Sequence, residues 1–232
     1  MRYRLMVDPQ IFEQYPDYQA LILYAEGLVN GPSDAESVDL LRSAEKSCRA
    51  SLTRDTITLQ PHVAAWRHAY QRFGAKPKKY PCSLEALLSR TVKGQDLPVI
   101  NRLVDLYNAL SLKYLLPVGG EDWDCLESDL HLTFARGNEP FLVLQEGQEQ
   151  VTYPEVGEVI WVDEGGVTCR RWNWRQGMRT RLTEVTQAVY FVLDRLAPYP
   201  TETLWNAGEE LKQRLQQWCP SCTVETELLA LS

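Results

Sequence analysis

The sequence contains no apolar run that approaches the roughly 20 residues of a membrane-spanning helix. Its first residues, MRYRLMVDPQIF, lack the apolar stretch and the small-residue cleavage site of a signal peptide. We therefore expect a cytoplasmic protein with no membrane partner. The six cysteines are mostly spaced singly, as buried thiols are in a reducing compartment, and this spacing argues against a disulfide framework.

Standard catalytic and nucleotide-binding signatures are also missing. The sequence has no GxGxxG, P-loop, GxSxG or HExxH pattern, so it gives no sign of ATP binding, a serine esterase or a zinc peptidase. The one CxxC pattern, from Cys219 to Cys222, has no second pair and no nearby histidine, whereas a structural zinc normally takes four protein ligands. We expect no cofactor and no metal ion.

The charge balance is acidic overall but uneven along the chain. The sequence has 24 Lys and Arg against 31 Asp and Glu, which gives a net charge of -7. Residues 67–80 and 170–181 nevertheless hold five basic residues each and no acidic residue. Basic segments on an acidic body suit a defined anionic partner better than general binding to nucleic acid.

Hydrophobic periodicity predicts an α+β fold with layered β-sheets flanked by helices. Helices dominate the first half and short strands the second, and no repeat or long linker divides residues 1–232, so we expect one domain. The predicted helices are 33–52, 61–73, 83–92, 97–114 (capped by Asp96) and 201–218. The predicted strands are 18–29, 130–135, 141–144, 158–162, 167–174, 189–193 and 223–229.

Three short polar residues share one face of the fourth predicted helix. Asn101, Asp105 and Asn108 have the spacing i, i+4 and i+7, and such residues lower helix propensity. The paired glycines Gly119 and Gly120 follow, where backbone amides could approach a ligand or form a simple tight turn. We interpret the polar stripe and this turn as one pocket; the alternative is a solvated helix face.

The segment VTCRRWNWR is the second group of candidate residues. As a strand, it would place Arg171, Asn173 and Arg175 on one face and Trp172 and Trp174 on the other. Guanidinium groups beside indole rings suit phosphate contacts and base stacking, so we predict an RNA-binding surface. Cation–π packing within the fold is the alternative.

The loop GAKPKKY supplies two further candidates for contact with RNA. Its lysines Lys78 and Lys79 could meet phosphate groups, or they could remain solvated, as lysines in exposed loops commonly do.

Two long segments, WRHAYQRFGAKPKKYPCSLEALLSRTVKGQDLPVINRLVDLYNALSLKYLLPVGGEDWD and RRWNWRQGMRTRLTEVTQAVYFVLDRL, carry a family resemblance. Roughly residues 60–196 resemble the stand-alone proteins related to the tRNA-binding and editing domain of the phenylalanyl-tRNA synthetase beta subunit. The resemblance implies an α+β domain and a tRNA partner, because the synthetase relative binds and hydrolyses wrongly charged tRNA. The synthetase module is missing, so we expect neither ATP binding nor aminoacylation.

The sequence departs from that family at one position of interest. Where the synthetase domain usually has a histidine in a Pro-Met-His-type stretch, this chain reads PVGGE. Asn101 and Asn108 match the asparagine-containing helix of the family. Thr183, Glu184 and Thr186 lie near its threonine- and acid-bearing motif, and we carry all five residues over as pocket candidates.

Our leading functional hypothesis is a tRNA-binding aminoacyl-tRNA deacylase that acts on misaminoacylated tRNA in trans. In this hypothesis Asn101 and Asn108 orient water or the aminoacyl group, Glu121 or Glu184 acts as the base, and backbone amides near the paired glycines face the oxyanion. Asp105 and the two threonines would help to bind the substrate. The alternatives are a non-catalytic module that binds a small amino acid or aminoacyl-like ligand and a protein-interaction domain that uses exposed aromatic residues.

Overall fold

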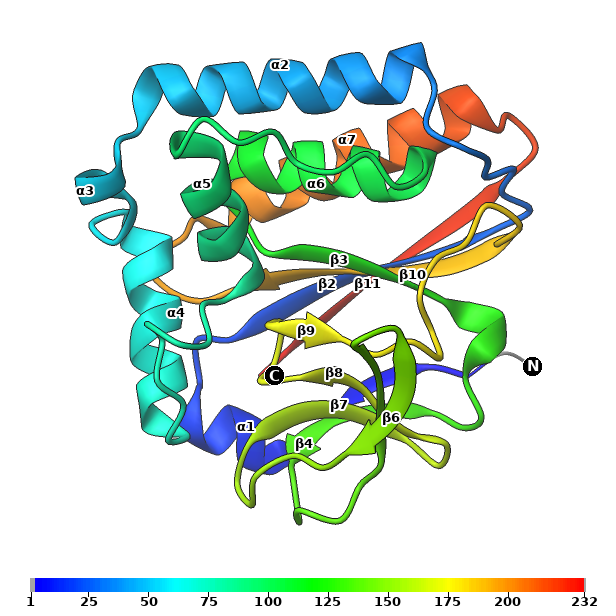
Figure 1. Ribbon diagram of the computed structural model, residues 1–232. Coiled ribbons are helices and arrows are strands. Elements are labelled where there is room, and N and C mark those ends of the chain that lie inside the picture. Colours follow the sequence, from blue (N-terminus) through cyan, green and yellow to red (C-terminus); the bar gives the residue numbers. More distant parts are fainter. Residues whose placement is uncertain (1–2, 232) are drawn as a thin grey trace.

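A four-stranded antiparallel sheet forms the middle layer of the computed structural model, which describes residues 3–231 (Figure 1). Its strand order is β11 (Thr223–Ala230), β2 (Gln19–Glu26), β10 (Ala188–Arg195) and β3 (Val118–Asp122). Both faces of the sheet are covered, so the central strand β2 reads as the nearly continuous apolar run QALILYAE.

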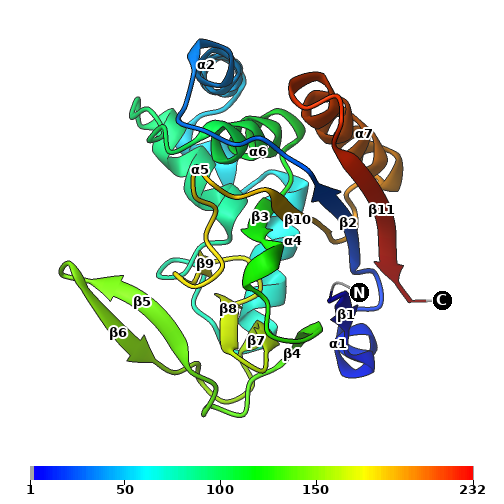
Figure 2. The same ribbon diagram turned by 90° about the vertical axis from the view of Figure 1, so that its right-hand side faces the viewer.

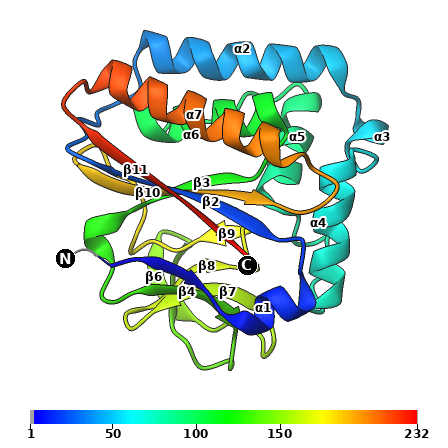
Figure 3. The same cartoon turned by 180° about the vertical axis from the view of Figure 1, so that it is seen from behind.

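Helices cover one face of the middle sheet (Figures 1 and 3). Helices α6 (Arg102–Tyr114) and α7 (Thr201–Trp218) pack directly on it, and α2 (Ala35–Ser51) lies on the outer side of α6. Leucine and phenylalanine side chains fill this interface: Leu21, Leu23, Phe191, Leu106, Leu110, Leu204 and Leu211. The repeat of apolar residues along each helix therefore marks the face that meets the sheet.

A second, five-stranded sheet covers the other face of the middle sheet. Its strand order is β1 (Leu5–Val7), β4 (Leu130–Phe134), β7 (Val159–Asp163), β8 (Gly166–Arg170) and β9 (Arg175–Gln176). Helices α1 (Pro9–Gln14) and α4 (Pro61–Arg72) lie beside this sheet. The core between the sheets is rich in aromatic side chains: Tyr18, Tyr24, Trp66, Tyr70, Trp161, Trp172 and Tyr190.

The remaining elements lie at the edges of these layers. Helices α3 (Arg54–Ile57) and α5 (Ser83–Val92) connect the helical layer to α4 and to the second sheet. A short 3-10 helix, η1 (Trp123–Cys125), follows β3. The hairpin of β5 (Phe141–Gln145) and β6 (Gln148–Thr152) projects from the body (Figure 2).

The predicted α+β class is confirmed, and the predicted helices 83–92 and 201–218 match α5 and α7. The assignment of residues 1–232 to one domain stays a prediction. The sequence did not predict the strand β3, whose glycines were expected to form a turn, or the short elements β1, α1, α3, η1, β6 and β9. In residues 3–231, no helix combines the length and apolar character that a membrane crossing requires.

Two predicted elements are wrong in ways that affect the candidate site. The helix predicted at 97–114 begins only at Arg102, because Asn101 is its N-cap and accepts a hydrogen bond from the Val104 N–H at 3.1 Å. The strand predicted at 167–174 ends at Arg170, because Arg171 and Trp172 have φ angles of 46° and 65°. These left-handed conformations turn the chain out of the sheet.

Candidate functional site

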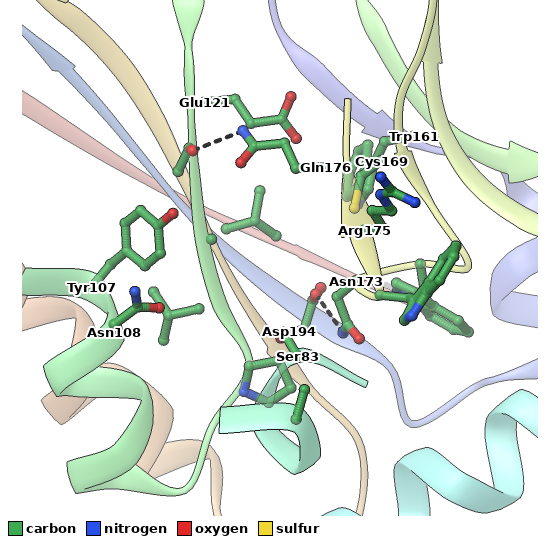
Figure 4. A pocket seen from close by; sticks show the side chains of 18 of the residues that line it. Ser83, Tyr107, Asn108, Glu121, Trp161, Cys169, Asn173, Arg175, Gln176 and Asp194 are labelled. Atoms are coloured by element: carbon green, nitrogen blue, oxygen red, sulfur yellow. Dashed lines mark hydrogen bonds between the residues drawn. The ribbon is translucent and has the colours of Figure 1, made fainter. Parts of the chain in front are cut away.

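A cavity of about 290 Å³ lies where the edge strand β3 of the middle sheet meets the edge strand β9 of the second sheet (Figure 4). The Gln176 side chain spans the junction and donates a hydrogen bond from Nε2 to the Gly120 carbonyl at 3.1 Å. Helices α5 and α6 complete the walls. Five aromatic side chains give the cavity an apolar lining: Tyr107, Trp161, Trp172, Trp174 and Tyr190.

Glu121 lies at one end of this cavity and is almost completely buried, with 8% of its surface exposed. The Thr180 hydroxyl donates a hydrogen bond to its carboxyl group. Burial raises the pKa of Glu121 to about 6, although hydrogen bonds from neutral side chains oppose this shift. The carboxyl therefore titrates close to neutral pH.

Asp194 lies at the opposite end of the cavity (Figure 4). Its carboxyl group accepts hydrogen bonds from the Tyr18 hydroxyl at 2.7 Å and from Asn173 Nδ2 at 2.9 Å. Burial raises its pKa to about 6 as well. In the described part of the chain, neither Glu121 nor Asp194 forms an ion pair with a lysine, arginine or histidine.

The backbone at Gly120 faces the same junction. Its carbonyl bonds to Gln176 rather than to β10, and in an antiparallel strand the N–H and C=O of one residue point to the same side. The Gly120 N–H therefore also points away from β10, toward the open edge of β3. A Cβ atom at this position would lie 2.8 Å from the Phe191 ring, so only glycine fits here without displacing a neighbour.

The structure brings four predicted pocket residues together in this cavity: Asn108, Gly119, Gly120 and Glu121. Asn108 is half-buried on α6, and Gly119 is exposed. Gly119 and Gly120 form part of a strand, not the tight turn that we expected. The functional roles assigned to these residues stay predictions.

Asn101 and Asp105 do not line the cavity, so our interpretation of a single polar stripe is wrong. Asn101 caps α6 and donates from Nδ2 to the Leu182 carbonyl at 3.3 Å. Asp105 is fully buried and accepts hydrogen bonds from the Ile100 N–H and the Ser37 hydroxyl, both at 3.1 Å. Since the helix begins at residue 102, the regular spacing of the three residues does not extend along a helix face.

Thr183, Glu184 and Thr186 also lie outside the cavity lining. Thr186 is buried, accepts a hydrogen bond from the Thr183 N–H at 3.0 Å and donates one to Asp122 Oδ2 at 2.7 Å. Glu184 is exposed in the loop between them. The three residues form a turn that ties β3 to the chain before β10, which corrects their expected place in the pocket.

Two of the predicted RNA-binding residues are buried. Trp172 is completely buried in the core between the sheets. Arg171 is 3% exposed, pairs with Glu158 at 3.3 Å, and lies 3.7 Å from the centre of the Tyr80 ring. The left-handed turn directs both side chains inward, so the packing alternative is correct for these two residues.

The other predicted RNA-binding residues lie at or near the cavity. Asn173 and Trp174 line it, and Arg175 lines it with an exposed side chain. Lys78 and Lys79 are exposed in the loop before Tyr80. The Tyr80 ring packs edge-on against the Trp174 ring, with ring centres 4.9 Å apart. The two basic segments of the sequence therefore lie side by side near one wall of the cavity.

The histidines and cysteines offer no nucleophile or metal ligand at this site. His62 is buried and forms hydrogen bonds with the Leu115 carbonyl and the Trp66 indole. Burial lowers the pKa of His62 to about 4. Cys169 lines the cavity, but burial raises the pKa of its thiol far above the ordinary value. Among residues 3–231, no three His, Cys, Asp or Glu side chains are grouped to hold a metal ion.

Sequence reasoning missed Asp194, Gln176 and most of the aromatic lining. Asp194 carried a usable signal, because it continues the alternation of Tyr190 and Val192 on the inward face of an otherwise apolar strand. The predicted strand 189–193 ended one residue before it.

A comparison with protein-family models matches the part of the chain that contains this cavity. Residues 65–215 match the model of the B3/4 domain, which is found in the phenylalanyl-tRNA synthetase beta subunit. The chain belongs to the B3/4 domain family. This match confirms the family resemblance, and every cavity-lining residue of this B3/4 domain, from Ser83 to Asp194, lies within the matched span.

Comparisons with individual proteins add little beyond the family. No curated protein sequence matches the chain. Fifteen chains of solved structures match, among them an N-terminal fragment of the phenylalanyl-tRNA synthetase beta subunit from Pyrococcus horikoshii. The similarity to that fragment has a TM-score of 0.47 and 11% sequence identity, and it covers 97% of this chain and 52% of the fragment. The B3/4 chain thus spans about half the length of the solved fragment.

Proposed function

We propose that this B3/4 domain binds the aminoacyl end of a charged tRNA in the cavity and hydrolyses the ester bond in trans. The observation that carries this proposal is the pairing of a buried carboxyl group with a backbone amide at the cavity edge. The carboxyl belongs to Glu121, and the amide is the Gly120 N–H. Ester hydrolysis needs a base of this kind and a donor for the oxyanion.

The reaction follows from these two groups. With a pKa of about 6, Glu121 is largely ionised at pH 7 and is a stronger base than an ordinary carboxylate. Glu121 takes a proton from a water molecule, whose oxygen attacks the ester carbonyl carbon. The negative charge that develops on the carbonyl oxygen is stabilised by the Gly120 N–H. The tetrahedral intermediate then expels the ribose oxygen, which receives the proton from Glu121.

Positive charge near the cavity supports tRNA as the carrier of the aminoacyl group. Arg175 is exposed at the cavity, and Lys78 and Lys79 are exposed in the adjoining loop. The remainder of the chain is acidic, so it repels polyanions except at this place. The terminal nucleotides of a tRNA would meet these cations while the aminoacyl group enters the cavity.

The test is a deacylation assay over a panel of correctly charged and mischarged tRNAs. We expect at least one aminoacyl-tRNA to lose its amino acid, and we expect Glu121→Gln to slow this reaction by about 10²- to 10⁴-fold. Glu209→Gln is the matched control, because Glu209 is exposed on α7 outside the cavity. The proposal fails if the protein deacylates none of the panel, or if Glu121→Gln is as fast as the control.

A second candidate function is the binding of an amino acid without hydrolysis. The raised pKa of the Cys169 thiol and the position of His62 away from the cavity favour it, because a protonated thiol is a poor nucleophile and His62 does not line the cavity. In that case an amino acid amide would saturate the protein without RNA, and no charged tRNA in the panel would be cleaved.

A further inference from the structure

We propose that the Asp194 end of the cavity is a subsite for a primary ammonium group at the tip of an unbranched side chain, as in a lysyl or ornithyl group. This inference rests on the proposed function, because it names the amino acid class whose ester the Glu121 end would hydrolyse. The observations that carry it are the charge and lining of the cavity and the spacing of Glu121 and Asp194.

The partners of Asp194 leave its negative charge uncompensated. They are the Tyr18 hydroxyl and the Asn173 amide, which are neutral donors, and no cation among residues 3–231 pairs with the carboxyl. Arg175, the cation that lines the cavity, is exposed and lies 6.0 Å from the centre of the Trp174 ring. A buried carboxylate without a cation is costly to the fold, and a cationic ligand removes that cost when it binds.

The network around Asp194 is fixed in a way that favours a charged acceptor. The Tyr70 hydroxyl donates to Asn173 Oδ1 at 2.9 Å, so Asn173 must present its NH₂ group to Asp194. The Tyr18 ring also packs edge-on against Trp172, with ring centres 4.8 Å apart. Asn173 can only donate here, and the Tyr18 hydroxyl donates as well. Both hydrogen bonds favour the ionised form of this carboxyl, whereas burial without a cation disfavours it.

The aromatic lining suits a cation with an aliphatic stem. Trp161, Trp172 and Trp174 line the cavity, and the faces of indole rings attract ammonium groups. Methylene groups pack favourably on the same rings, so a long aliphatic chain with a charged end satisfies both parts of the wall.

The spacing of Glu121 and Asp194 fits a side chain of this kind. Glu121 is opposite Tyr190 in the pairing of β3 with β10, and Asp194 follows four residues later on the same face of β10. Four residues of a strand span about 13 Å. This span separates backbone positions, and the Glu121 and Asp194 side chains cover part of it. An ester held beside Glu121 therefore needs an extended side chain to bring an ammonium group within hydrogen-bonding distance of Asp194.

The hydrogen bonds of Asp194 favour an ammonium group over a guanidinium group. Tyr18 occupies one side of Oδ1 and Asn173 one side of Oδ2. A guanidinium group prefers to bridge both carboxylate oxygens with two parallel N–H bonds, and that approach competes with the existing donors. A compact ammonium group needs only one of the remaining lone pairs.

The experiment measures the binding of amino acid amides by the change in tryptophan fluorescence, with calorimetry as the second readout. L-norleucinamide keeps the aliphatic chain of L-lysinamide without the terminal ammonium group, and L-tyrosinamide offers a neutral hydroxyl donor. We expect L-lysinamide to bind at least about tenfold more tightly than either, which is about 1.4 kcal/mol. Asp194→Asn should abolish this preference and leave the affinity for L-norleucinamide unchanged, whereas Glu209→Gln should change neither.

The outcomes separate this inference from the proposed function. Equal or tighter binding of L-norleucinamide or L-tyrosinamide to the unaltered protein overturns the ammonium subsite, whatever Asp194→Asn does to folding, and leaves the deacylation assay to judge the function. If cadaverine binds but L-lysinamide does not, the subsite is supported and the aminoacyl function fails. If none of these compounds binds, the ammonium subsite is overturned, and the deacylation assay alone decides the proposed function.

Discussion

Two buried acidic sites in this molecule differ in what surrounds them. Glu158 is 3% exposed and is enclosed by cations: Arg170 donates to both of its oxygens at 2.8 Å, and Arg171 donates from its backbone N–H at 3.1 Å. Glu121 and Asp194 are also buried, but they have neutral partners and face a cavity.

This difference separates a structural role from a functional one. The Glu158 cluster holds the left-handed turn at Arg171, which ends β8 and directs Asn173 into the cavity. Its charges are satisfied within the fold. The two cavity carboxyls retain an unfavourable burial energy that a ligand or a proton can relieve. Burial alone therefore does not identify a site, whereas burial without a counter-charge beside a cavity does.

The largest expected effect is the loss of stability when Glu158, the acid enclosed by arginines, is removed. Glu158→Ala leaves Arg170 and Arg171 without their buried partner, and the removal of one member of a buried ion pair typically costs about 3–5 kcal/mol. We expect a decrease of that size in the free energy of unfolding, measured by urea denaturation.

A neighbouring glutamate provides the control for this variant. Glu155 also pairs with Arg171, at 3.2 Å, but its side chain is 76% exposed. Because exposed ion pairs contribute little, Glu155→Ala should cost at most about 1 kcal/mol. Equal losses in the two variants would mean that the Glu158 cluster is not the enclosed site described above.

At the cavity, removal of a buried negative charge is expected to increase the free energy of unfolding. The folded-state pKa of Glu121, about 6, lies above its ordinary value of 4.5, so the folded protein retains a proton that the unfolded chain releases between these pH values. The stability that this proton contributes is complete below about pH 4.5 and is lost as the pH rises through 6. At pH 8 the ionised group costs the fold about 2 kcal/mol.

Glu121→Gln should therefore stabilise the protein by about 2 kcal/mol at pH 8, and the gain should be largely absent at pH 4.5. Urea denaturation of the variant and the unaltered protein at both pH values measures this difference. Glu209→Gln controls for a general effect of net charge. A variant that is less stable than the unaltered protein at pH 8 would show that Glu121 is satisfied as fully as Glu158.

The sequence was informative wherever local pattern and tertiary structure agree. Helices 83–92 and 201–218 follow from their apolar repeats, and β2 follows from its β-forming run. The end of β8 could not be predicted, because alternation in VTCRRWNWR continues past Arg170. The strand ends where Arg171 adopts a left-handed conformation and its N–H bonds to Glu158, a residue 13 positions away in sequence.

The candidate site was only partly accessible to sequence reasoning for a similar physical reason. Gly119, Gly120 and Glu121 drew attention as a cluster of turn and acidic residues, although they form a strand. Asp194 acquires its importance from Tyr18 and Asn173, which are distant in sequence. Asn101 was predicted to line the pocket because a helix cap and a pocket residue require the same kind of short polar side chain.

A smaller effect is expected at another buried acid, Asp105, which tests the comparison between the enclosed site and the cavity carboxyls. Asp105 also lacks a cationic partner in the described structure, but it accepts a backbone N–H, lies in the first turn of α6 and does not line the cavity of Glu121 and Asp194. The helix N-terminus favours its negative charge. Asp105→Asn should therefore destabilise the fold by about 1 kcal/mol in the same urea assay, opposite in sign to Glu121→Gln. Deacylation rates should not change, and stabilisation at pH 8 would erase the distinction between the two acids.

The smallest expected effect is on the salt dependence of tRNA binding. It concerns two arginines, one enclosed by the fold and one at the cavity, which differ as the two acidic sites do. Arg171 is buried and ion-paired, whereas Arg175, four positions later, is exposed at the cavity. If Arg175 contacts one phosphate of the single-stranded tRNA end, Arg175→Ala should reduce the slope of log affinity against log salt by about 0.7. Titrations of the tRNA at several salt concentrations measure this slope. Lys46→Ala removes an exposed charge from α2 in the outer helical layer and should leave the slope unchanged. Equal changes in the two variants would indicate that tRNA responds to net charge rather than to the cavity rim.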